Sequence, residues 1–171
     1  NFAEELDWYL LERAPHQGVR LLVQDLNALY KTQSALHELD FDDSGFEWID
    51  SHDSAQSVLS FLRKDQAGNI LVAVFNFTPI PREGYRIGVP KPGFYREVLN
   101  SDAAVYGGSN MGNRGGRQTD ETPWMNRDYS IPLDLPPLGG LMLQHEPSGK
   151  KGTPEKAGET EGHGVETLKA Y

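Results

Sequence analysis

The side chains that could carry nucleophilic, redox or metal chemistry are scattered along this sequence. It has no cysteine, which excludes disulfides, a thiolate zinc site and a thiol nucleophile. Its five histidines include no pair at metal-ligand spacing on one element. Asp40, Asp42 and Asp43 cluster, but they lack the regular ligand spacing and the glycine of a calcium loop, which favours a solvated capping loop. The sequence therefore predicts neither a metal site nor a cofactor.

Two other motifs could suggest chemistry, and both have a simpler interpretation. Ser51-His52-Asp53 places a hydroxyl, an imidazole and a carboxylate side by side, but it falls between two predicted strands, where a surface turn is expected. The glycine pairs at 107–108 and 115–116 precede no predicted helix, so they do not indicate a phosphate-binding cradle.

Aromatic residues are the better candidates for contacts with a ligand. Trp48 and Phe46 follow the acidic loop directly. A tryptophan ring can stack on the apolar face of a sugar at little cost in conformational entropy, but Trp48 could equally be a core residue. Tyr106 and Trp124 lie in a long polar loop and could form a second contact surface, or simply anchor that loop. Trp8 lies on an apolar segment and is expected to pack in a core.

The elements that must position these residues fall into two groups. Residues 6–11 form a short apolar segment that Pro15 and Gly18 should interrupt. Apolar residues then recur at i, i+3, i+4 and i+7 over residues 19–30, which predicts an amphipathic helix. A short turn capped by Ser34 should follow. Such helices bury an apolar stripe only against other elements.

After a loop at residues 40–45 the pattern changes to short strands separated by turn residues. The expected strands are residues 46–49, 57–63, 70–77, 85–89, 94–99, 129–135 and 141–143, and the almost continuously apolar 70–77 should be central. This spacing predicts a mainly β fold, an antiparallel β-sandwich. Residues 100–125 form a loop long enough to suggest a functional or mobile segment.

The charge of the chain restricts its partners. The net charge is −9, and the lysines and glutamates after residue 146 cancel, so residues 1–146 carry all of it. An acidic protein repels phosphate backbones, so no nucleic-acid partner is expected, whereas neutral ligands such as sugars are not penalised. No apolar run approaches the length of a membrane span and residues 1–5 are not a signal peptide, so we expect no membrane partner and a cytoplasmic location.

Several segments, in order, resemble the C-terminal region of bacterial 1,4-α-glucan (glycogen) branching enzymes. They include Leu6-Asp7-Trp8, Gly45-Phe46-Glu47-Trp48, Asn76-Phe77-Thr78-Pro79, Asn100-Ser101-Asp102 and Leu135-Pro136-Pro137-Leu138, together with residues 18–27, 35–42, 57–61, 85–89 and 106–113. The resemblance covers about residues 5–146 and does not include the tail.

That family is similar to α-amylases, which have a (β/α)8 catalytic barrel followed by an all-β C-terminal domain. The resemblance implies that residues 1–40 are the last helices of a truncated barrel and that residues 44–146 form the all-β domain. Residues 147–171 contain almost no apolar side chain, which predicts a disordered tail. The whole enzyme cuts an α-1,4-glucan and transfers the freed segment to a 6-hydroxyl, which makes an α-1,6 branch.

Such retaining chemistry needs carboxylates at the C-terminal ends of barrel strands. None of the motifs that carry them occurs here, so the resemblance predicts no catalytic residue, and the chain alone should be inactive. Ser51-His52-Asp53 is similar to the His-Asp motif of the family, but it lies within the β-domain segments, where a catalytic role is not expected. The implied partners are an α-1,4-glucan, such as glycogen or amylose, and the upstream catalytic barrel of the same polypeptide.

The resemblance also places Trp48 at the junction between barrel and β domain, facing the substrate cleft. Trp48, Phe46 and Tyr106 are therefore the candidate substrate-binding residues. Two alternatives remain: the equivalent fragment of a relative such as a maltooligosyl trehalose hydrolase, and a stand-alone glucan-binding module. The helices before residue 40 argue against the module, because a free module has no use for an apolar helix face.

Overall fold

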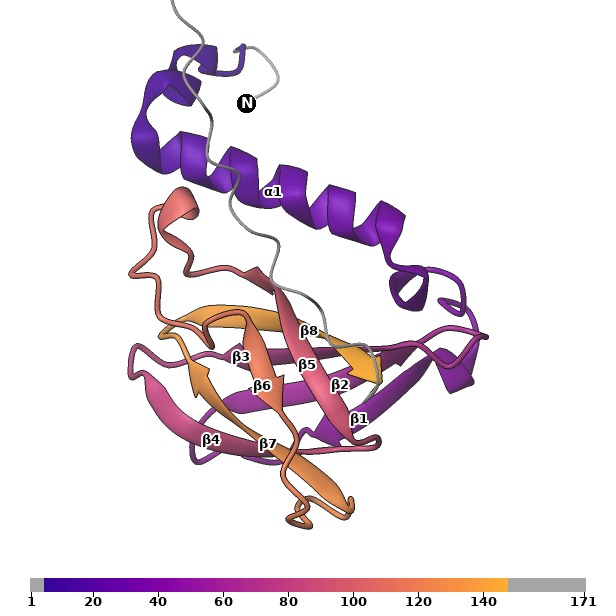
Figure 1. Cartoon of the computed structure of the whole chain (residues 1–171). Coiled ribbons are helices and arrows are strands. Elements are labelled where there is room, and N and C mark those ends of the chain that lie inside the picture. Colours follow the sequence, from indigo (N-terminus) through magenta and orange to yellow (C-terminus); the bar gives the residue numbers. More distant parts are fainter. Residues whose placement is uncertain (1–4, 148–171) are drawn as a thin grey trace, which may run out of the picture.

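The computed structural model describes residues 5–147, which form two antiparallel β-sheets and a helical segment (Figure 1). The larger sheet has six strands in the order β1-β2-β3-β8-β5-β6, and the smaller sheet pairs β4 with β7. The strands of the larger sheet are β1 (Phe46–Asp50), β2 (Val58–Lys64), β3 (Ile70–Asn76), β8 (Gly139–Pro147), β5 (Gly93–Asn100) and β6 (Gly116–Gln118). The smaller sheet consists of β4 (Arg82–Val89) and β7 (Tyr129–Leu135). The predicted disordered tail lies, apart from Pro147, outside the described residues.

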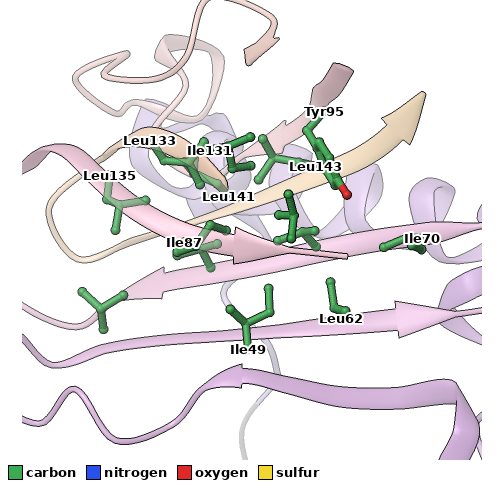
Figure 2. Close-up of a cluster of buried hydrophobic side chains, with 14 residues drawn as sticks. Ile49, Leu62, Ile70, Ile87, Tyr95, Ile131, Leu133, Leu135, Leu141 and Leu143 are labelled. Carbon is green, nitrogen blue, oxygen red and sulfur yellow. The ribbon is translucent and has the colours of Figure 1, made fainter. Parts of the chain in front are cut away.

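The core lies between the two sheets and follows from alternation along the strands, because successive side chains of a strand point to opposite faces. Figure 2 shows Ile87 of β4 and Ile131 of β7 in one buried cluster with Leu141 of β8. The three side chains are fully buried. The mainly β, antiparallel fold class predicted from the sequence is therefore confirmed, and β3 lies inside the sheet as expected.

The helical segment differs from the expectation. One α-helix, α1 (Ala14–Thr32), is flanked by the short 3-10 helices η1 (Trp8–Glu12) and η2 (Ser34–Leu36), so the expected helices are seen only in part. Pro15 and Gly18 do not interrupt a helix. Pro15 lies in the first turn of α1, where a proline costs no hydrogen bond, and Gly18 lies inside the helix.

At Gly18 the helix α1 packs directly on another segment, so this position requires a residue without a side chain. A side chain at this position would place its Cβ 2.2 Å from the backbone oxygen of Tyr106, in the 3-10 helix η4 (Ala104–Tyr106). The sequence signal of a helix-breaking glycine therefore marks a close contact. Figure 1 shows α1 on the face of the six-stranded sheet that points away from β4 and β7.

The long polar loop after β5 is ordered by its own side chains. Asp102 accepts hydrogen bonds from the backbone N–H of Ser109 and Met111, at 2.9 and 3.1 Å. Asn113 is fully buried and bonds both Glu97 of β5 and the backbone of Asp134 in β7. Part of the loop then joins the larger sheet as β6.

Within residues 5–147, no helix combines the length and the apolar character needed to cross a lipid bilayer.

Candidate functional site

The candidate residues Phe46 and Trp48 lie together on β1, an edge strand of the larger sheet. They are two residues apart in a strand and therefore share a face, and their ring centroids are 4.9 Å apart in an edge-to-face arrangement. Trp48 is 49% exposed. The ring is thus neither buried in the core between the sheets nor isolated, and it is available to a ligand or to another segment.

These two rings begin a row of aromatic side chains across the outer face of the sheet. Phe61 of β2 lies 5.2 Å from Phe46 and 5.9 Å from Trp48. Phe75 of β3 stacks on Phe61, and Phe77 stacks on Phe75, at centroid distances of 6.0 and 6.1 Å. The rings of Phe61, Phe75 and Phe77 are roughly parallel, with angles of 27° and 19° between neighbours. Phe46 and Trp48 at one end of the row and Phe77 at the other are exposed, whereas Phe61 and Phe75 between them are half-buried.

Glu47, between the two candidate residues, fixes the strand from the other side. Its carboxylate pairs with Lys64 of β2, at 2.5 Å, and with Arg127. Partial burial raises the pKa of Glu47, but the hydrogen bonds from Lys64 and Arg127 outweigh it, so the pKa lies below its usual value. The carboxylate remains charged at neutral pH, and β1 is held so that Phe46 and Trp48 stay on the outer face.

Tyr106 is not brought together with Trp48 and Phe46. It follows β5, and three strands, β2, β3 and β8, separate β5 from β1 in the sheet. Its hydroxyl donates a hydrogen bond to Asp25 of α1 at 2.5 Å. Burial and this acceptor raise the pKa of Tyr106 to about 12. Tyr106 thus links α1 to the loop after β5.

The triplet Ser51-His52-Asp53 forms a turn between β1 and β2, as the sequence predicts. The His52 side chain is 93% exposed, and Ser51 contacts it only weakly, at 3.3 Å. Asp53 points the other way and accepts a hydrogen bond from the Tyr85 hydroxyl at 2.7 Å. Burial and this acceptor hold the pKa of Tyr85 well above its usual value. The three side chains do not form a relay.

The acidic cluster also has a structural role. Asp40 forms an ion pair with Arg63 of β2 at 2.6 Å. Asp42 accepts a hydrogen bond from the Ser44 backbone N–H at 2.8 Å, which caps a short 3-10 turn and lowers the pKa of Asp42. Among the described residues, no group of three or more metal-ligating side chains lies close enough together to hold an ion.

One cavity lies against the larger sheet and another against the smaller sheet. An apolar cavity of about 320 Å³ lies between α1 and the outer face, where Leu22 and Leu26 face Phe75 and Met142. A more polar cavity of about 330 Å³ lies beside β4, with Asp53 and Gln56 on one side and Trp124 on the other. Trp124, which the sequence grouped with Tyr106, thus belongs to a different region of the molecule.

The apolar stripe of α1 is covered only in part. Leu22 and Leu26 face the sheet across the apolar cavity. Val19 and Val23, one turn apart, are 64% and 49% exposed. A helix normally buries its apolar stripe, so part of α1 lacks a covering element among the described residues.

Sequence reasoning missed Phe61, Phe75 and Phe77 as parts of the aromatic row. Phe75 and Phe77 are two residues apart, a signal that they share a strand face. Their neighbours on β1 and β2 depend on the register between strands, which pairs Trp48 with Phe61 and Phe61 with Ala73. That register is not visible in any local pattern.

Comparison with known proteins adds a family and a set of relatives. The family model described as "Alpha amylase, C-terminal all-beta domain" matches residues 48–146. Three similar proteins carry the name 1,4-alpha-glucan branching enzyme GlgB. They come from Marinobacter nauticus, Nitrosococcus oceani and Aquifex aeolicus, with identities of 57% over 142 residues, 56% over 145 and 54% over 142. These matches cover 82–84% of this chain but only 19–22% of each relative, so the chain spans about a fifth of their length.

Proposed function

Because the chain belongs to the family of alpha-amylase C-terminal all-beta domains, we propose that it is the C-terminal part of a 1,4-α-glucan branching enzyme. The observation that carries this proposal is the identity of more than half to named branching enzymes over 142–145 residues. The family match covers residues 48–146 alone, so the similarity extends outside the β domain.

The proposed activity belongs to the whole polypeptide. It would cleave an α-1,4-glucan such as glycogen or amylose and transfer the segment to a 6-hydroxyl. Retaining transfer of this kind needs two carboxyl groups about 5–5.5 Å apart on either side of the sugar bond. Two carboxylates of this chain with well-defined partners have structural roles. Glu47 forms ion pairs with two cations, and Asp65 accepts hydrogen bonds from Ser34 and Asn69. The proposal therefore assigns no catalytic residue to the chain, and it includes the cytoplasmic location expected from the sequence.

Within that enzyme, residues 1–40 would complete the catalytic domain and residues 44–146 would form the C-terminal domain. The exposed apolar side chains of the first part support this division, since Val19 and Val23 on α1 and Trp8 on η1 are not covered by the rest of residues 5–147. Contiguous exposed apolar surface marks sites of interaction. The rest of the catalytic domain would supply the cover.

Phe46 and Trp48 would contribute a wall that contacts glucan. Their support is the half-exposed indole of Trp48 on an edge strand, held in place by the two ion pairs of Glu47. Tyr106 remains a separate candidate. Its hydroxyl already donates to Asp25, so a sugar hydroxyl would have to compete with that contact.

The proposal is tested by comparing this chain with a polypeptide extended upstream to the length of the relatives. Each is incubated with amylose, and the absorbance of the iodine complex is followed, with new α-1,6 linkages counted by NMR. The extended polypeptide should form branches and the chain alone should not. Sustained branching by the chain alone, or hydrolysis without branching by the extended polypeptide, would contradict the assignment.

A further inference from the structure

The cavity beside β4 is built from three segments that are distant in the sequence. Asp53 and Gln56 come from the loop between β1 and β2, Tyr85 and Arg86 come from β4, and Trp124 and Met125 come from the loop before β7. Its volume of about 330 Å³ is at the lower end of the range of about 300–1,000 Å³ found for ligand pockets. The space suits a small ligand or one or two rings of a longer one.

The turn that carries Trp124 is closed by its own backbone hydrogen bonds. Trp124 and Arg127 exchange both backbone hydrogen bonds, each 3.0 Å long, and the two residues between them have φ of +47° and +63°. This is the geometry of a tight two-residue hairpin. Gly88 of β4 allows the turn to pack closely against the strand, because a Cβ at this position would lie 2.2 Å from the Trp124 carbonyl oxygen.

Two side chains of the turn hold it to the body of the domain. Met125 packs against the core between the sheets, and Arg127 forms the ion pair with Glu47 of β1. The indole of Trp124 is nevertheless 46% exposed. A large flat apolar ring is thus presented at the cavity by a fixed support, which lowers the entropy cost of binding.

The polar groups opposite the ring are also held in place. Asp53 accepts hydrogen bonds from the Gln56 amide at 3.0 Å and from the Tyr85 hydroxyl at 2.7 Å. Arg86 donates to Asp120 and Ser130, at 2.8 and 2.7 Å. Each of these groups is fixed by protein contacts before any ligand arrives.

The charges beside the cavity disfavour an anionic ligand. The carboxylate of Asp53 repels a phosphate or carboxylate, and the guanidinium of Arg86 is already paired with Asp120. A ligand with an apolar face and several hydroxyls would stack on the indole and exchange hydrogen bonds with the carboxylate and amide oxygens. Sugars have this combination.

We propose that the cavity lined by Asp53, Gln56, Tyr85, Arg86 and Trp124 binds a glucosyl segment of an α-1,4-glucan. Trp124 covers one face of a sugar ring, and Asp53 and Gln56 bind its hydroxyls. The choice of α-glucan among sugars rests on the proposed function. The site is separate from Trp48, which lies on the outer face of the larger sheet.

The test is a titration of the ¹⁵N-labelled 171-residue chain with maltoheptaose, followed by NMR. The chain has three tryptophans, and the indole signals are assigned by single Trp→Phe variants. The Trp124 signal should move and saturate, and the Trp8 signal should not move. Trp124→Ala should weaken binding about two- to tenfold, from the worth of an aromatic contact, and Trp124→Phe should weaken it less. Gln56→Ala should also weaken it, whereas Trp8→Ala should leave affinity unchanged.

The outcomes separate this proposal from the function it rests on. If the Trp124 signal stays fixed while the extended polypeptide branches amylose, the cavity proposal is overturned and the branching proposal stands. If the Trp124 signal saturates but the extended polypeptide forms no branches, the cavity proposal stands and the branching proposal is overturned. Equal affinity for cellohexaose would overturn the assignment to α-glucan. Because Trp124 is half exposed, its variants should remain folded, and the dispersion of their NMR spectra checks this.

Discussion

At the scale of single residues, the position of Trp48 separates two roles that the sequence left equal. A tryptophan in the core between the sheets would be buried, but Trp48 is 49% exposed and its edge-to-face contacts are with Phe46 and Phe61. Replacing a buried tryptophan by alanine costs about 3–5 kcal/mol of stability. A half-exposed ring should cost clearly less, because only part of it leaves a cavity.

We expect Trp48→Ala in the extended polypeptide to raise the KM for amylose about tenfold, as loss of a stacking contact of about 1–2 kcal/mol implies. Trp48→Phe should recover part of the loss. Phe77→Ala, at the other end of the aromatic row, is the matched control and should leave KM unchanged. Melting temperature is measured for each variant, and a large drop for Trp48→Ala with unchanged KM would reduce Trp48 to a packing residue.

Asp65 is the buried carboxylate that links the helical segment to the β2–β3 hairpin. It accepts hydrogen bonds from Ser34 of η2 and from both the backbone and the side chain of Asn69, at 2.8 and 2.7 Å for the latter two. Burial raises the pKa of Asp65, but these hydrogen bonds outweigh it, so the folded pKa is lowered. The stabilisation is therefore complete above the unfolded pKa of about 3.9 and is lost as pH falls through the lower folded value.

Asp65→Asn should therefore reduce the free energy of unfolding by about 1–3 kcal/mol at pH 7. The difference from the unmodified chain should shrink below about pH 4, as that chain loses the same carboxylate. Urea unfolding at pH 7, 5 and 3.5 measures both effects. Glu83→Gln, on an exposed part of β4, should change the value by no more than about 0.5 kcal/mol at any pH. A pH-independent difference for Asp65→Asn would show that the charge is not what stabilises the link.

At the scale of elements, α1 is docked by one close backbone contact. Gly18→Ala should be destabilising by about 1–3 kcal/mol, because the new Cβ would lie 2.2 Å from the Tyr106 oxygen. This exceeds the gain of about 1 kcal/mol that alanine gives over glycine inside a helix. Thermal unfolding measures the change, and Asn27→Ala, on the exposed side of α1, is the control that should be neutral or slightly stabilising. A more stable Gly18→Ala would mean that α1 does not sit on η4.

The elements that local pattern predicted are those whose side chains alternate between core and surface. Strands β2 and β7 have such patterns, and β3 is recognised by its nearly continuous apolar run, which is buried on both faces; each was placed to within a residue or two. Strand β6 was missed because its three residues, Gly116–Gln118, join the sheet through pairing with β5 rather than through burial of their own. The order of the preceding loop depends on bonds such as Asn113 to Asp134, between residues far apart in the sequence.

The candidate site was predictable to the same extent. Spacing alone puts Phe46 and Trp48 on one face of a strand, but it does not say that the strand lies at the sheet edge with that face outward. Nor does it separate Tyr106 from Trp124, since both occur in one loop. Their assignment to opposite parts of the molecule follows from Asp25 of α1 in one case and from Gly88 of β4 in the other.

At the scale of the whole molecule, the two sides of α1 should respond differently to substitution. Leu22 faces the sheet across the apolar cavity, whereas Val19 and Val23 face outward. If α1 packed only against the β-sheets described here, its outward side would contribute little to the stability of the protein. In an enzyme whose catalytic domain continues upstream, the same side would be buried.

The double substitution Val19→Ser and Val23→Ser should therefore leave the unfolding of the 171-residue chain almost unchanged, because valine and serine have similar helix propensities and both sites are exposed. In the extended polypeptide it should lower stability by about 2–5 kcal/mol, as two buried apolar side chains are lost and two hydroxyls are buried. Leu22→Ala is the control that should destabilise both proteins. Differential scanning calorimetry of the four variants and their parents measures the contrast. An equal effect of the double substitution in both proteins would mean that α1 packs only against the β domain, and the division at residues 40–44 would have to be withdrawn.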